Sequence, residues 1–184
     1  MALTKIDIRA IVKGHAASLR DVRTGRSSPG DVALFVGGPL FLAGVAIWRG
    51  VQIRSTAINA LLTAYSIFAG LLFNLVMLVI TFLERTHGNA NDASLQARKR
   101  LLREITANVS FSILTAVAMV AVAIVGLIVA RDDRDPAATF VSALLVAGST
   151  NFVLNLLMIL KRMYALVINE FDRHKLQKGP SQAA

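Results

Sequence analysis

The feature that most constrains this chain is a set of four long stretches without a charged residue. They are residues 32–48, 55–83, 105–130 and 137–160. A helix needs about 20 apolar residues to cross the hydrocarbon core of a bilayer, with a usable range of about 17–25. The first stretch lies at the lower limit, and Gly37, Gly38 and Pro39 within it disfavour a regular helix. The pattern predicts an all-α, polytopic membrane protein with four transmembrane helices.

The composition agrees with a membrane protein and excludes two other classes. The chain is 55% hydrophobic and 17% charged, yet 20 Lys and Arg against 11 Asp and Glu give a net charge of +9. So apolar a chain is neither a disordered protein nor a soluble nucleic-acid-binding domain. In membrane proteins an excess of Lys and Arg marks the cytoplasmic segments. The positive charge is therefore expected to be chiefly a topology signal.

The distribution of the basic residues predicts the orientation of the four spans. Sixteen of the 20 lie in residues 1–31, in the connector 84–104 and in the tail from residue 161, and four lie in the two short turns. The positive-inside rule places the larger set in the cytoplasm. Both termini are then cytoplasmic, as an even number of spans requires, and the expected location is the bacterial inner membrane.

The chain is predicted to divide into a membrane domain with cytoplasmic helices at both ends. Residues 1–30 form an amphipathic helix and a hinge, residues 31–163 the four-helix domain, and residues 164–184 a helical extension and tail. The N-terminal helix keeps Ile8, Ile11 and Val12 near one face. Such a helix either lies at the anionic inner leaflet or packs on the other cytoplasmic elements.

The chemistry of the chain argues against a transporter and an enzyme. Ionisable residues inside membrane spans mark proton relays and ion-coupled transport, and the four stretches contain none. Cysteine is absent, and His15, His87 and His174 lack metal-ligand spacing and are expected to be exposed to solvent. The sequence shows no phosphate-binding loop, nucleophile elbow or metal-carboxylate motif. We therefore predict no catalytic residue, no metal site and no cofactor.

Neutral polar side chains inside the predicted spans are the main candidate functional residues. They recur at helical steps of three and four, which keeps each set on one side of its helix. The candidates are Thr63, Ser66 and Asn74 in the second span, Ser112 and Thr115 in the third, and Asn151 and Asn155 in the fourth. Such residues either hydrogen-bond between helices or line an aqueous pathway. Helix contact is favoured for the hydroxyl residues, and both interpretations stay open for the three asparagines.

A run of basic residues before the third span is a candidate contact for anions or lipids. It consists of Arg98, Lys99 and Arg100, with Arg103 one turn further on. Such a run ordinarily acts as a positive-inside determinant, and a specific site for an anion or a nucleotide is the alternative. Anionic membrane lipids are the predicted partners, together with a cytosolic regulatory protein or a nucleotide or nucleic-acid signal.

Two segments resemble a known group of proteins. The sequences TAYSIFAGLLFNLVMLVITFLE and REITANVSFSILTAVAMV, joined by a basic connector, resemble small four-span membrane proteins of bacterial anti-phage defence operons. The resemblance covers about residues 60–120. It implies an effector that oligomerises and permeabilises or depolarises the inner membrane when a cytosolic partner signals infection. It assigns no role to particular residues.

The predicted function is an oligomeric channel or pore-type effector, gated through its cytoplasmic helices. A four-helix protomer fills its own centre with side chains, so conduction requires a closed ring of copies, and a homo-oligomer is predicted. Two alternatives fit the same pattern. The chain is then either a non-catalytic membrane anchor that recruits a cytosolic partner or a phage holin.

Overall fold

The computed structural model describes residues 8–18, 30, 33–84, 93–129 and 136–178. They form α1 (Ile8–Ser18), the π-helix η1 (Ala33–Gly37), α3 (Gly38–Trp48), α4 (Ser55–Glu84), α5 (Ala93–Val129) and α6 (Pro136–Lys178). No β-strand occurs within these ranges. The prediction of an all-α protein is confirmed.

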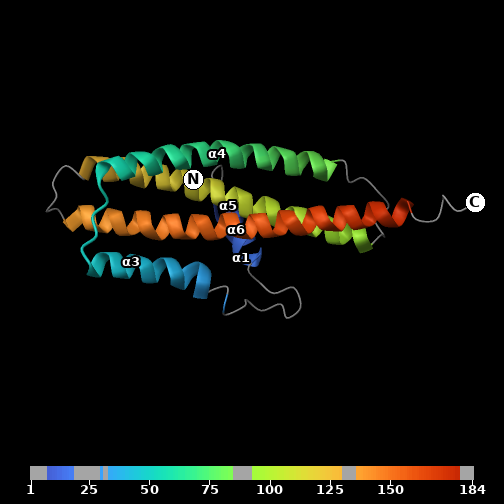
Figure 1. Cartoon of the computed structure of the whole chain (residues 1–184), viewed down its shortest axis with the longest axis horizontal. Helices are drawn as coiled ribbons and strands as arrows, with labels where there is room; N and C mark the ends of the chain where they lie inside the picture. The colour runs from blue at the N-terminus through green and yellow to red at the C-terminus, as the bar shows by residue number, and fades with distance from the viewer. Residues whose placement is uncertain (1–7, 19–29, 31–32, 85–92, 130–135, 179–184) are drawn as a thin grey trace, which may run out of the picture.

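Three of the helices are long and apolar enough to cross a bilayer. The apolar spans are Ser55–Thr81 in α4, Lys99–Val129 in α5 and Pro136–Ile168 in α6. The three helices run side by side along the long axis of the molecule (Figure 1). This arrangement is that of a multi-pass membrane protein.

The ends of α5 and α6 lie well outside the predicted spans. α5 begins at Ala93, inside the predicted connector 84–104, and continues without a break into its apolar span. α6 continues to Lys178, through most of the predicted extension. The bundle therefore projects beyond its apolar part at the end that carries the basic residues of α5.

The predicted first span differs from the other three. η1 and α3 together form an apolar helical segment, Ala33–Trp48, that is shorter than the spans of α4, α5 and α6. At 1.5 Å per residue the segment is about 24 Å long, whereas the hydrocarbon core measures about 30 Å. It packs along α6 (Figure 1). The described residues thus contain three helices of spanning length and one shorter apolar segment.

One backbone carbonyl of η1 lacks its usual helical donor. Pro39 has no backbone N–H, so the carbonyl of Phe35, four residues earlier, cannot accept the usual helical hydrogen bond. Asn151 of α6 supplies a donor instead, with its Nδ2 atom 3.1 Å from the Phe35 carbonyl oxygen. Neighbouring side chains are expected to satisfy broken helices in this way inside a membrane. The bond also ties η1 to α6.

Asn151→Leu should therefore loosen η1 from α6. The change leaves the Phe35 carbonyl without this donor, at a cost of about 1 kcal/mol. In a Pro39→Ala background the new N–H at position 39 can bond the Phe35 carbonyl, so the same change should cost clearly less. Unfolding in mixed micelles with increasing SDS measures the loss in the free energy of unfolding that Asn151→Leu causes in each background. Equal costs in the two backgrounds would contradict this role of Asn151.

The core of the bundle lies between α4, α5 and α6. Its fully buried side chains include Ile58 of α4, Val109 of α5 and Leu145 of α6. Gly148 of α6 brings that helix close to α5, because the sulfur of Met119 occupies the space that a side chain at position 148 would need. The position of α6 against α5 therefore depends on a residue without a side chain.

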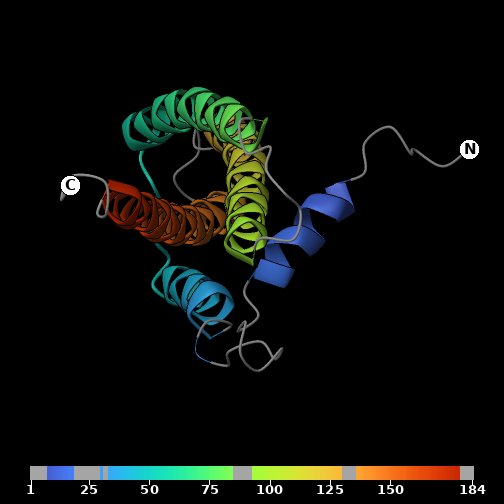
Figure 2. The ribbon, with the colours of Figure 1, turned by 90° about the vertical axis from the view of Figure 1, so that its right-hand side faces the viewer.

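α1 lies across the bundle rather than along it. Figure 2 looks along the long axis and shows α4, α5 and α6 close to end-on, whereas α1 runs outward beside α5. Among the described elements, α1 packs on α5 alone. A Cβ atom built on Gly14 would lie 3.4 Å from that of Ala107, so the two helices approach closely there.

Candidate functional site

The contact between α1 and α5 is built around His15, for which the sequence predicts exposure to solvent. That expectation is wrong, because the residue is only 7% exposed. Its ring stacks on that of Phe111 with parallel planes and centroids 4.0 Å apart. Nδ1 of His15 lies 3.0 Å from the amide oxygen of Asn108, to which it donates a hydrogen bond. Position 15 follows Ile11 by four residues and so belongs to the apolar face of α1, a signal that could have identified it.

Burial lowers the pKa of His15 below its ordinary value of 6.5. The hydrogen bond with Asn108 acts in the opposite direction, and the positive charge of Arg162 on α6 adds to the lowering. His15 is therefore a neutral imidazole at neutral pH. Protonation would place a positive charge in a desolvated contact beside a second cation.

A chain of charged side chains joins α5 to α6 near this contact. Oε1 of Glu104 accepts a hydrogen bond from Nε of Arg100 at 3.2 Å, and its Oε2 lies 3.3 Å from Nη1 of Arg162. The Arg162 and Glu104 side chains are 17% and 25% exposed, so water only partly screens their attraction. The carboxylate of Glu104 thus holds two arginines from two helices.

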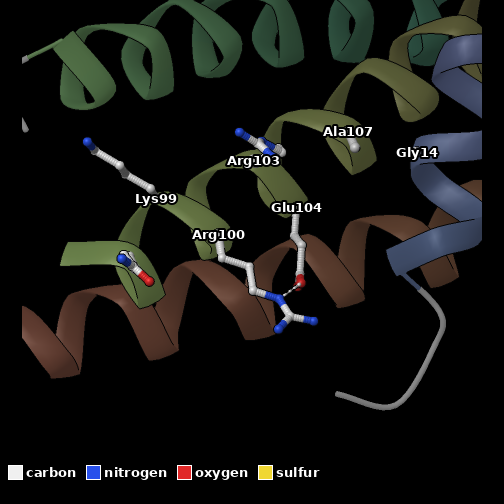
Figure 3. A pocket seen from close by; sticks show the side chains of 7 residues that line it. Gly14, Lys99, Arg100, Arg103, Glu104 and Ala107 are labelled. Carbon is white, nitrogen blue, oxygen red and sulfur yellow. Dashed lines mark hydrogen bonds and ion pairs between the residues drawn. The ribbon is translucent and has the colours of Figure 1, made fainter. Parts of the chain in front are cut away.

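Two adjoining hollows, each of about 550 Å³, lie where α1 meets α5. Figure 3 shows the first of them. We call them together the basic cleft. The first is lined by Gly14, Gln96, Lys99, Arg100, Arg103, Glu104 and Ala107. The second is lined by Ala10, Ile11, Lys99, Arg103, Thr106, Ala107 and Ser110. In Figure 3 Arg100 turns toward Glu104, whereas Lys99 and Arg103 extend away from that pair.

The structure brings three members of the predicted basic run to the cleft. They are Lys99, Arg100 and Arg103. The fourth, Arg98, lies in α5, but its side chain is outside the part that the structure describes, as is that of His174. His87 lies outside the described residues altogether.

The predicted polar residues divide between the outside and the inside of the bundle. Thr63, Ser66 and Asn74 are exposed on α4, Ser112 and Asn155 are buried, and Thr115 and Asn151 are half-buried. The sequence pattern alone does not separate these groups. Their different positions decide which of them another molecule can reach.

The exposed group forms one side of α4. The buried residues of that helix, Tyr65 and Leu72 among them, recur every seven residues and face the core. Thr63, Ser66 and Asn74 lie on the opposite side, which we call the α4 polar face. The hydroxyls of Thr63 and Ser66 donate to the carbonyls four residues earlier. The face therefore points away from α5 and α6.

The buried group lies between α5 and α6. Nδ2 of Asn155 donates to the carbonyl oxygen and to Oδ1 of Asn151, at 3.0 and 2.8 Å. Oδ1 of Asn155 and Oγ of Ser112 have no hydrogen-bond partner among the described residues. Both side chains are enclosed by the protomer, so they have no direct contact with its surroundings.

Comparisons with protein-family models, curated proteins and solved structures find no match to this chain. Within the described ranges, no three His, Asp or Glu side chains gather in a group that could hold a metal ion. The features that the structure brings together are the His15 contact, the basic cleft and the α4 polar face.

Proposed function

We propose that this chain is the protomer of an oligomeric channel-type effector of the bacterial inner membrane. One observation carries the proposal: the α4 polar face points away from the core of the protomer. Inside a membrane, polar side chains are found against other helices or against water-filled cavities. The neighbour expected at this face is therefore α4 of a second copy of the chain. A water-filled pathway would form where the α4 helices of several copies meet.

The depths of the helices support four spans with both termini in the cytoplasm. Counted from Val129, α5 reaches Val109 after about 30 Å, which is the thickness of the hydrocarbon core. α1 crosses α5 at that level, as an amphipathic helix at the inner surface would. The segment formed by η1 and α3 lies along α6 and would cross most of the same core, with slight local thinning of the bilayer.

The proposed gate is α1. A gating element must detach or move without unfolding the spans, and α1 is fastened to one helix through a short contact around His15. The resemblance of residues 60–120 to anti-phage membrane effectors supports a role in depolarising the membrane during infection. A cytosolic signal that removes α1 from α5 would then open the pathway.

The test is the conductance of the purified protein in planar bilayers. The wild type should give discrete current steps, and Asn74→Leu should reduce the unit conductance several-fold, because it removes the largest polar group of the α4 polar face. Leu157→Ala changes an exposed residue of a different helix, α6, and should leave the conductance unchanged. A stable oligomer that never conducts would instead favour the membrane anchor.

A further inference from the structure

We propose that the basic cleft binds a phosphate-bearing anion, in the membrane a lipid headgroup of the inner leaflet, and that this ligand fastens α1 to α5. This inference rests on the proposed function, in which the protein has both termini in the cytoplasm and α1 is the gate. The anion is the ligand that would act on that gate.

The charges of the cleft favour the binding of an anion. Lys99 and Arg103 are four residues apart on α5, where two like charges repel each other. In the part of the chain that the structure describes, neither has an ion-pair partner. The nearby carboxylate of Glu104 is already shared by Arg100 and Arg162. An incoming anion is thus the group that can neutralise Lys99 and Arg103 together.

The shape of the cleft suits a phosphate group. The lining of the cleft includes small residues, Gly14 and Ala107 in one hollow and Ala10 and Ser110 in the other. They leave room for an ion beside the helices. A guanidinium can bind two phosphate oxygens at once, and Lys99 adds a second positive group.

The depth of the cleft favours a lipid headgroup as the source of the phosphate. Arg103 lies about 39 Å along α5 from Val129, beyond a hydrocarbon core of about 30 Å. This is the level of the headgroups. Basic pockets between helices at the cytoplasmic surface are typical sites for anionic lipids.

Binding should be coupled to the docking of α1, because both helices line the cleft. A ligand that binds only the docked arrangement shifts the equilibrium toward it by its binding free energy. Anionic lipid would therefore hold the gate closed.

The experiment measures hydrogen exchange of the α1 amides, Ile8–Ser18, in the full-length protein at one neutral pH. The protein is placed in nanodiscs of phosphatidylcholine, in nanodiscs that also contain phosphatidylglycerol, and in phosphatidylcholine nanodiscs with inorganic phosphate. Phosphatidylglycerol should slow exchange in α1 by roughly tenfold. Protection by inorganic phosphate at millimolar concentration would also support anion binding in the cleft. The ligand would then be a soluble phosphate and not a lipid headgroup.

Variants separate the cleft from general surface charge. The double change Lys99→Gln with Arg103→Gln should abolish the protection, whereas Lys99→Arg with Arg103→Lys should keep it. Arg49→Gln with Arg54→Gln removes the same charge from the opposite end of the bundle and should also keep it. The proposal is overturned if neither anion protects wild-type α1, if the Gln pair at 99 and 103 still responds, or if the pair at 49 and 54 loses the response. Because no current is measured, failure of the channel proposal would leave this result standing.

Discussion

Gly148→Val should displace the Met119 side chain and destabilise the contact between α5 and α6. Even the first carbon of a side chain at position 148 would overlap the sulfur of Met119 and would lie 2.6 Å from its Cε atom. Met119 is 5% exposed, so it has little space into which to turn. Overpacking of this kind typically costs about 1–3 kcal/mol, and valine adds two further methyl groups.

The double variant with Met119→Ala provides the decisive comparison. Shortening Met119 removes the atoms that overlap the new side chain, so it should restore much of the stability that Gly148→Val loses. Gly44→Val places the same side chain on α3, where nothing lies within 4 Å of an added Cβ atom, and serves as the matched control. SDS-induced unfolding in micelles gives the free energies of unfolding. Failure of Met119→Ala to restore stability would show that another contact limits the space at Gly148.

Acidification should release α1 from α5. In the docked state the pKa of His15 lies below 6.5, because the ring is buried and faces Arg162, whereas in the undocked state it returns to its ordinary value. Docking is therefore fully favoured above pH 6.5. As the pH falls below 6.5 toward the docked pKa, the undocked form takes up a proton that the docked form does not. The docking equilibrium then weakens, by at most about tenfold per pH unit for one group.

Hydrogen exchange of α1 at pH 7.5 and pH 5.5, corrected for the intrinsic exchange rates, measures this release. The wild type should lose protection at the lower pH. His15→Gln keeps a polar side chain that does not titrate in this range, so its α1 should respond far less to acid. An equal response in His15→Gln would show that another group is responsible.

The sequence was sufficient for the parts of the fold that depend on hydropathy and its periodicity. The spans in α4, α5 and α6 agree with three of the four uncharged stretches, because burial in lipid requires an apolar surface on every side of a helix. The first stretch is shorter in the sequence itself, and η1 and α3 follow it over Ala33–Trp48. Pro39 leaves the Phe35 carbonyl of η1 without its usual helical donor.

Which side chains come together in the candidate site depends on which helix faces pack against each other. The periodicity of the sequence does not determine that packing. The stripe with Ser66 on α4 and the stripe with Ser112 on α5 look alike in the sequence. One is exposed and the other is buried. Likewise, nothing local to Glu104 or to Arg162 indicates that the two side chains will pair.

The contact between α1 and α5 also has a consequence for the order of events during synthesis. His15 and its partner Asn108 are 93 residues apart in the chain. At roughly 5–20 residues per second, a ribosome needs about 5–20 s to make the residues between them. Throughout that interval the apolar side of α1 lacks the helix on which it packs. The contact can therefore form only after α5, the second of the three long helices, has been synthesised.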